Sequence, residues 1–215
     1  MNRELQKFLG FAAAVGALVL VVSVLGERFL FNVSGPETAI VTRLKQLERE
    51  GLEIVAPVGT LAGGKLQYQR ISIALDADGQ GALVTSTLDF TGVLKRRDGT
   101  ETKVSSLGLE RARYRLKDDE WQPETNDAPR LLAIIAALDE RRVAIDAGAA
   151  YAEIQHRRWV SQAWFIRSER DDVEVAEDYR LTGSTPDKPI DEKSTRRLSL
   201  REDGAQRFSF PGGIM

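Results

Sequence analysis

The 215-residue sequence predicts an α+β protein in which an N-terminal transmembrane helix precedes two modules, each a helix followed by a curved antiparallel sheet. Three observations predict this class. Residues 8–25 contain no charged side chain. Apolar residues recur at helical spacing near residues 36–50 and 131–145. Alternating apolar and polar stretches, separated by turn dipeptides such as Asp78-Gly79, follow both segments. Strands that follow a helix in this way are typical of α+β proteins.

The apolar segment 8–25 predicts a membrane anchor. As a helix its 18 residues span about 27 Å, close to the hydrocarbon thickness of a bilayer. Arg3 and Lys7 precede it in a short lead, residues 1–7, and no small-x-small cleavage site follows it. We therefore expect an uncleaved single-pass signal anchor. Residues 1–7 would be cytoplasmic, residues 26–35 a juxtamembrane linker, and the remainder extracytoplasmic, in the periplasm.

Small residues cluster in the first half of this segment. Ala12 and Gly16, and also Ala13 and Ala17, lie four positions apart. This spacing lets a second helix approach closely, so these residues are candidates for packing between membrane helices. The alternative is a plain anchor that faces lipid on all sides.

The first module is expected over residues 36–126. Ser34 and Pro36 suit a helix start, and Gly51 suits its end, which predicts a helix over 36–50. The strands that follow are expected at 52–58, 71–75, 84–90 and 104–116. The apolar alternation of the last strand slips between Leu109 and Ala112, which predicts a bulge beside Gly108.

The second module is expected over residues 127–215. Asp127 and Pro129 suit the capped start of a helix, and Asp146-Ala-Gly148 suits a bend or break in it. Four strands follow, at 159–166, 173–182, 194–201 and 206–210.

The second module resembles the nuclear-transport-factor-2-like (SnoaL-type) superfamily. Residues 138–148, LDERRVAIDAG, are similar to the first helix and turn of that group, and three long strands follow in the same order. The resemblance implies a cone-shaped α+β fold whose curved sheet encloses a pocket. Because the same fold serves enzymes, binding proteins and oligomerising scaffolds, the resemblance implies no particular function.

The most unusual residue of this module is Glu177, which shares one face of its strand with Val175 and Tyr179. A carboxylate on an apolar face is costly unless it is paired or reached by water. Two interpretations follow. Glu177 lines a ligand pocket with Tyr179, Trp164, Arg196 and His156, or it forms a structural ion pair with Arg196 or turns outward at a bulge.

His156 is the sole histidine of the chain. It is a candidate general acid or base, but it is followed by Arg157 and Arg158 at an expected helix end, where cations complement the helix dipole. A capping role at that helix end is the alternative.

Composition excludes several function classes. The chain has no cysteine, no metal-ligand spacing, no nucleophile beside a base and no phosphate-binding glycine loop. We therefore expect no catalytic residue, no metal and no cofactor. Lys and Arg number 30 against 32 Asp and Glu, which disfavours nucleic acid as a partner.

These observations predict a non-enzymatic, membrane-anchored accessory or assembly subunit, whose partners are other subunits of a membrane protein complex. One alternative is a domain that binds a small hydrophobic ligand in the cone pocket of the second module. A further alternative is a hydrolase or isomerase that uses Glu177, Tyr179 or His156.

Overall fold

The computed structural model describes residues 35–56, 58–147, 151–203 and 207–211. The predicted anchor at 8–25, its small residues Ala12, Ala13, Gly16 and Ala17, and the linker up to residue 34 lie outside the described residues. Within the described ranges, no helix is both long enough and apolar enough to cross a membrane. The chain divides into two compact units, Met1–Thr42 and Arg43–Met215.

The helix predicted over 36–50 is confirmed as α2 (Pro36–Glu50), which begins in the first unit and ends in the second. At its start the carbonyl of Gly35 accepts the N–H groups of Thr38 and Ala39. At its end Gly51 has a φ of +85°, a conformation that glycine adopts without strain, and donates its N–H to Leu47.

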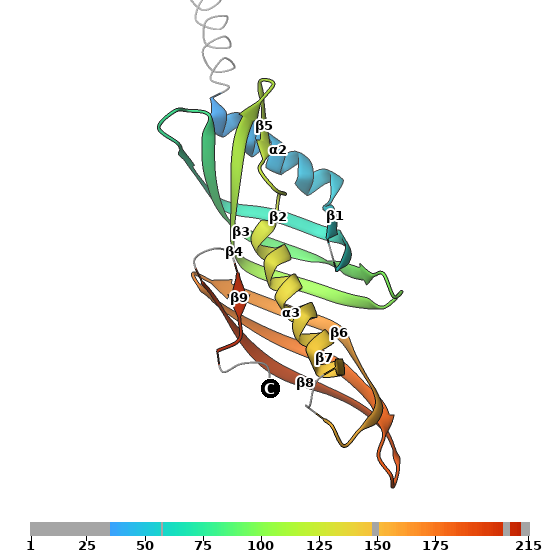
Figure 1. Cartoon of the computed structure of the whole chain (residues 1–215). Helices are drawn as coiled ribbons and strands as arrows, with labels where there is room; N and C mark the ends of the chain where they lie inside the picture. Colours follow the sequence, from blue (N-terminus) through green and yellow to red (C-terminus); the bar gives the residue numbers. More distant parts are fainter. Residues whose placement is uncertain (1–34, 57, 148–150, 204–206, 212–215) are drawn as a thin grey trace, which may run out of the picture. The chain divides into compact units, whose positions relative to one another are not determined.

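The second unit is built on a single curled mixed sheet, shown in Figure 1. Among the described residues its strands are β1 (Glu53–Ala56), β2 (Gly59–Leu75), β3 (Gly81–Arg96), β4 (Glu101–Lys117), β5 (Glu120–Pro123), β6 (Gln155–Glu169), β7 (Asp172–Ser184), β8 (Pro189–Glu202) and β9 (Phe208–Ser209). Their order across the sheet is β1-β2-β3-β4-β6-β7-β8-β9, with β5 paired to β4. The α+β class is therefore confirmed.

The two expected modules share this sheet instead of each forming its own. Lys103–Gly108 of β4 pairs with Ala163–Ser168 of β6, and this pairing is parallel whereas the others are antiparallel. Gly108 has a φ of +151°, and a Cβ at this position would collide with the backbone of Ser168. Glycine is thus required where the two halves of the sheet meet.

The bulge predicted beside Gly108 is wrong, because the β3–β4 register runs unbroken from Gly81–Arg115 to Lys95–Glu101. The buried residues of β4 all lie at alternate positions, and two of them, Ser106 and Glu110, are polar. The apolar residues alone therefore do not alternate, although the strand itself is regular. The register shifts of this sheet lie in β2 and β6.

The second predicted helix is α3 (Pro129–Ala147), which packs against β4, β6 and β9 on one face of the sheet (Figure 1). Its buried stripe includes Leu131, Ile135 and Leu138, as the spacing predicts. The break predicted at 146–148 agrees with the end of α3, although residues 148–150 lie outside the described ranges. Strand β6 begins soon after, so His156 lies on a strand and the expected helix-end position is wrong.

The predicted acidic cap is corrected as well. Asp127 does not cap α3 in this structure: its carboxylate accepts hydrogen bonds from Arg43 at 3.1 Å and from the Tyr114 hydroxyl at 3.0 Å. Glu110, on β4, instead accepts the N–H groups of Arg130 and Leu131 in the first turn of α3, at 2.8 and 3.0 Å. A strand residue twenty positions before Arg130 in the sequence thus accepts the free backbone N–H groups at the start of the helix.

Candidate functional site

The predicted pocket residue Glu177 lies on the buried side of β7 and is 2% exposed. Its Oε1 accepts hydrogen bonds from Ser161 Oγ at 2.5 Å and from the indole nitrogens of Trp159 and Trp164, each at 3.3 Å. Its Oε2 accepts a hydrogen bond from Arg196 Nε at 2.7 Å and forms an ion pair with Arg196 Nη2, which lies 2.6 Å away. Both carboxylate oxygens therefore accept hydrogen bonds, four in all, from side chains of the protein itself.

An aromatic stack holds Arg196 in this position. The rings of Trp159 and Tyr179 are stacked, with centroids 3.8 Å apart and planes 15° apart. The Arg196 guanidinium lies 4.0 Å from the centroid of the Trp159 ring and 5.4 Å from that of Tyr179. Cation–π attraction therefore adds to the ion pair. Burial raises the pKa of the Tyr179 hydroxyl, so this group stays neutral at ordinary pH.

The structure brings together four of the five predicted pocket residues: Glu177, Tyr179, Trp164 and Arg196. His156 is not among them, because it occupies an exposed position at the start of β6 with a φ of +51°. Sequence reasoning missed Ser161 as a donor to Glu177. The available signal was the two-residue alternation along β6, which places Ser161 on the same face as Trp159.

A second buried polar group adjoins this network through Trp164. Arg96, at the end of β3, donates to Asp139 of α3 at 2.7 Å and to Thr102 at 2.6 Å, and its guanidinium lies 5.2 Å from the Trp164 ring centroid. Arg142 also donates to Asp139, at 3.0 Å. These contacts join the β3–β4 hairpin to α3. In the described part of the chain no group of three or more acidic or histidine side chains could hold a metal ion.

Glu110 and Arg130 form a third buried polar group, at the start of α3. Arg130 is fully buried and donates to Glu202 of β8 at 2.9 Å and to the Leu109 carbonyl at 3.0 Å, and it also donates to the Arg170 carbonyl. Burial raises the pKa of Glu110 to about 7, against the opposing effect of the backbone N–H groups that it accepts. This carboxylate accepts backbone N–H groups at the helix start, and Glu110 is only 2% exposed.

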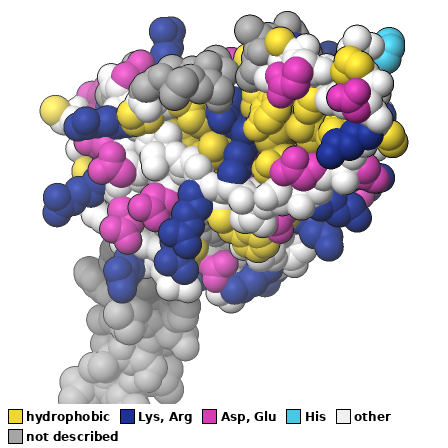
Figure 2. All heavy atoms as spheres, turned by 90° about the horizontal axis from the view of Figure 1, so that it is seen from below, with side chains coloured by type: hydrophobic (Ala, Val, Ile, Leu, Met, Phe, Trp, Pro, Cys, Tyr) yellow, Lys and Arg dark blue, Asp and Glu magenta, His cyan; other side chains and the backbone are white. Residues whose placement is uncertain are grey.

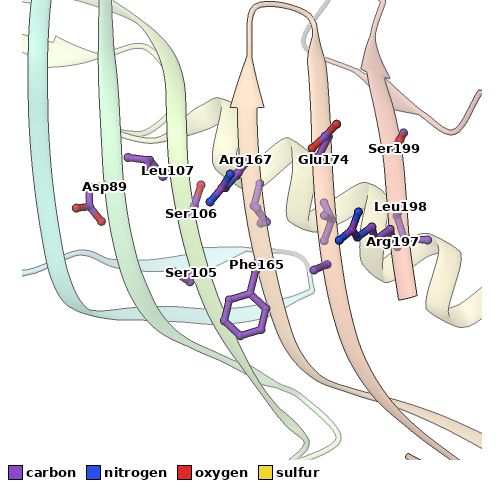
Figure 3. A pocket seen from close by; sticks show the side chains of 13 residues that line it. Asp89, Ser105, Ser106, Leu107, Phe165, Arg167, Glu174, Arg197, Leu198 and Ser199 are labelled. Carbon is purple, nitrogen blue, oxygen red and sulfur yellow. The ribbon is translucent and has the colours of Figure 1, made fainter. Parts of the chain in front are cut away.

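An open hollow of about 690 Å³ lies on the opposite face of the sheet from α3 (Figure 3). Leu107 and Phe165 reach it and are each 51% exposed. Arg167 and Arg197 stand beside them, with Glu174 on the strand between. None of these three charged side chains forms an ion pair with a described residue. The hollow combines exposed apolar surface with unpaired charge, which is typical of an interaction surface.

Hydrophobic side chains also reach the surface elsewhere. On the face seen in Figure 2 they gather in areas separated and bordered by acidic and basic side chains. Other large apolar side chains that are exposed include Val55 on β1 and Val143 on α3.

Comparisons with known proteins give one structural likeness to report. No family model matches the sequence, and no curated protein matches it. A solved structure described as "Ntf2 like protein involved in plasmid conjugation" matches with 10% identity and a TM-score of 0.27, over 71% of this chain and 74% of that chain. The description names the superfamily that residues 138–148 resemble. At this identity and TM-score the likeness carries no information about activity, partners or site residues.

Proposed function

We propose that this chain is a single-pass, membrane-anchored accessory or assembly subunit of a membrane protein complex, and that it acts by binding proteins and not by catalysis. Its N-terminus would lie in the cytoplasm and its α+β part in the periplasm. The basis for the anchor is the uncharged segment 8–25 with its basic lead.

The observation that carries the non-catalytic part of the proposal is the bonding of Glu177. A general base needs a free acceptor within hydrogen-bond reach of its substrate. Glu177 is 2% exposed, and both of its oxygens already accept hydrogen bonds from Trp159, Ser161, Trp164 or Arg196. We therefore rank a hydrolase or isomerase that uses Glu177 below a binding protein.

The same residues bear on the small-ligand alternative. Trp159 and Trp164 are among the largest fully buried side chains of the described residues, and they fill the space around Glu177. A ligand would have to displace these rings. The exposed hollow with Leu107 and Phe165 favours recognition of a protein surface instead.

Purification of the tagged full chain from its native membranes in a mild detergent tests the proposal. We expect other membrane proteins to co-purify in a fixed ratio, and to be lost when the membranes are extracted in a harsh detergent before capture. Recovery of this chain alone from the mild detergent would overturn the proposal.

The absence of cysteine makes the orientation testable. Asn2→Cys and Arg97→Cys each introduce a single thiol into the full chain, the second in an exposed turn between β3 and β4. We expect a membrane-impermeant maleimide to label Arg97→Cys in cells with a permeabilised outer envelope, and to label Asn2→Cys only after the inner membrane is broken. The reverse pattern would exclude the proposed topology.

A further inference from the structure

We propose that the outer edge of β8 binds an extended, acidic segment of another protein, which joins the sheet as an added strand. Strand β8 (Pro189–Glu202) lies beside β7, and among the described residues only the two-residue strand β9 follows it in the strand order (Figure 1). The inference rests on the proposed function, which supplies the partner protein. It adds the place on this chain where that partner binds and the chemistry of the segment that fits there.

Most of the outer edge of β8 has no partner strand. Strand β9 pairs with β8 only at Arg201 and Glu202. On its inner side β8 pairs with β7 from Asp172–Arg201 to Ser184–Pro189 without a register shift. In the part of the chain that the structure describes, no other strand pairs with β8. A regular edge strand of this length is a template for a further strand.

The hydrogen bonds at the end of β8 show which of its backbone groups face outward. The Glu202 N–H donates to the Asp171 carbonyl, so the even-numbered residues of β8 direct their N–H and C=O groups towards β7. The odd-numbered residues from 191 to 199 therefore direct theirs away from the sheet. These outward groups are the donors and acceptors that an added strand would bind.

The opposite edge of the sheet is closed at the positions where it can be compared. Strand β1 pairs with the start of β2, and the Gly63 N–H donates to the Leu52 carbonyl at 2.7 Å. The Tyr68 N–H of β2 donates to Glu48 of α2 at 2.6 Å. Prolines, glycines and bulges commonly prevent pairing at an edge, and β8 contains none of them after Pro189. The β8 edge therefore remains open.

The side chains along this edge favour an acidic segment. On the exposed side of β8, Lys193, Arg197 and Arg201 follow one another at intervals of four residues, about 13 Å in a strand. None of these three cations forms an ion pair with a described residue. Asp191, the acid on the same side, is already paired with Arg180 at 2.6 Å. Opposite charges directly across two strands stabilise their pairing and like charges destabilise it, so carboxylates should lie opposite the cations.

The other side of the added strand would lie beside apolar residues. Ile190 packs against the buried cluster that contains Trp159 and Leu181, and Leu198 is 9% exposed. Both are even-numbered residues of β8 and lie on its buried side. Because side chains of paired strands alternate in step, apolar residues are favoured at alternate positions of the segment. The fitting segment thus combines apolar residues on one side with carboxylates four positions apart on the other.

A different protein must supply this segment. No part of the chain outside the described ranges has two acidic residues four positions apart. A second copy of β8 would bring its own Lys193, Arg197 and Arg201 to the edge, and like charges on facing strands oppose pairing. The cations thus protect this edge from its own copies and select a strand of opposite charge.

Binding of a synthetic peptide to the purified full chain in a mild detergent tests the proposal. The probe is a fluorescent peptide with capped ends, Thr-Val-Glu-Val-Thr-Val-Glu-Val-Thr, whose glutamates can lie opposite Lys193 and Arg197. We expect saturable binding by fluorescence anisotropy, and weaker binding as salt is added. The same peptide with lysine for both glutamates should bind about tenfold more weakly or less. Equal binding of the two peptides would overturn the proposal.

A third peptide tests the backbone contacts. In antiparallel pairing the two glutamates lie opposite odd-numbered residues of β8, so their N–H groups face the edge. Methylation of these two nitrogens removes the donors and keeps both charges. We expect no saturable binding of the methylated peptide, because strand addition depends on main-chain hydrogen bonds. Undiminished binding would show that charge alone holds the peptide, and would overturn the proposal.

Two variants at Thr195 locate the binding on β8. The Thr195 hydroxyl donates to Asp178 at 2.6 Å, and Thr195→Pro and Thr195→Ala both remove this bond. Only Thr195→Pro also removes an outward N–H, at an edge position where proline is tolerated. We expect Thr195→Ala to bind the glutamate peptide normally and Thr195→Pro to bind it about tenfold more weakly. Equal binding by the two variants would overturn the proposal.

A charge exchange keeps the test decisive if Thr195→Pro unfolds earlier than Thr195→Ala by circular dichroism. The double variant Lys193→Glu with Arg197→Glu should bind the lysine peptide and reject the glutamate peptide. Because neither cation forms an ion pair with a described residue, the double variant should keep its thermal stability. An unchanged preference for the glutamate peptide would overturn the proposal.

Co-purification from native membranes separates this inference from the proposed function. Membrane proteins that co-purify with Thr195→Ala should be lost with Thr195→Pro, and equal recovery with both variants would overturn the inference. If the unchanged chain captures no membrane protein but discriminates among the peptides as expected, only the proposed function fails. If membrane proteins co-purify but the peptides bind equally, only this inference fails. A dimer of the chain alone that Thr195→Pro abolishes would assign the edge to a second copy and overturn the inference.

Discussion

Glu177 and Arg196 are direct partners in the β7–β8 register, and they form a buried ion pair in which Arg196 Nε and Nη2 lie 2.7 and 2.6 Å from Glu177 Oε2. Their side chains are 3% and 18% exposed. Two indole N–H groups and the Ser161 hydroxyl occupy the other oxygen. The pair is thus a structural element of the sheet, matching one of the two interpretations that the sequence allows.

Removing the cation should therefore destabilise the protein strongly. Arg196→Met leaves Glu177 buried without its charge partner, which typically costs about 3–5 kcal/mol. We expect a large fall in the thermal unfolding temperature of the full chain, measured by circular dichroism. Arg180→Met breaks the exposed Arg180–Asp191 pair on the same two strands and should change the temperature little. Equal effects of the two substitutions would contradict a structural role for Glu177.

Stability should fall as the pH rises towards neutral because of Glu110. Burial raises the pKa of this carboxyl from its ordinary 4.5 to about 7, so the folded state binds more protons than the unfolded state between these pH values. The contribution of Glu110 to the free energy of unfolding is then greatest below pH 4.5. On the order of 3 kcal/mol of this contribution is lost as the pH rises through 7.

The measurement is denaturation of the full chain between pH 5 and pH 8, compared with Glu110→Gln. The amide stays neutral throughout and can still accept an N–H from the start of α3, so the variant should lack this part of the pH dependence. Identical pH profiles for the two proteins would show that Glu110 does not titrate in this range.

The junction between the halves of the sheet should not tolerate a side chain at residue 108. Gly108→Ala adds a Cβ that collides with Ser168 and forces a φ of +151°, which together should cost about 3 kcal/mol or more. Gly99→Ala, in a turn with a φ of +79° and no atom near the added Cβ, is the matched control and should cost only the backbone strain. Limited proteolysis should then cut Gly108→Ala faster between β5 and β6, and equal rates would contradict the close approach.

The small residues of the predicted anchor give a prediction that rests on the sequence alone. Gly16→Leu puts a large side chain in the predicted small-residue pair of Ala12 and Gly16, four positions apart, so association with other membrane subunits should weaken. Co-purification from native membranes is the measurement, with Leu18→Ile as a control of nearly equal volume. Unchanged co-purification would return the segment to the role of a plain lipid-facing anchor.

Local patterns predicted both helices because helices leave short-range signals, but they predicted the strands only in part: the strand expected at 71–75 is the end of β2, which begins at Gly59. The helix over 36–50 appears with the same bounds, and the stripe of Leu131, Ile135 and Leu138 is buried. Patterns failed where a buried position is polar. Glu110 and Ser106 lie inside the sheet, so the apolar alternation of β4 was misread as a bulge.

By itself, the sequence determined the α+β class, the uncharged segment 8–25, and the presence of Glu177 on an apolar strand face. Only the tertiary structure decided that β4 pairs with β6 in parallel, that Glu110 serves the start of α3, and that Glu177 is fully bonded. The physical reason is that the donors to Glu177 lie on the two strands that flank β7. Trp159, Ser161 and Trp164 lie on β6, and Arg196 lies on β8. Such contacts depend on strand register and order, which local periodicity does not specify.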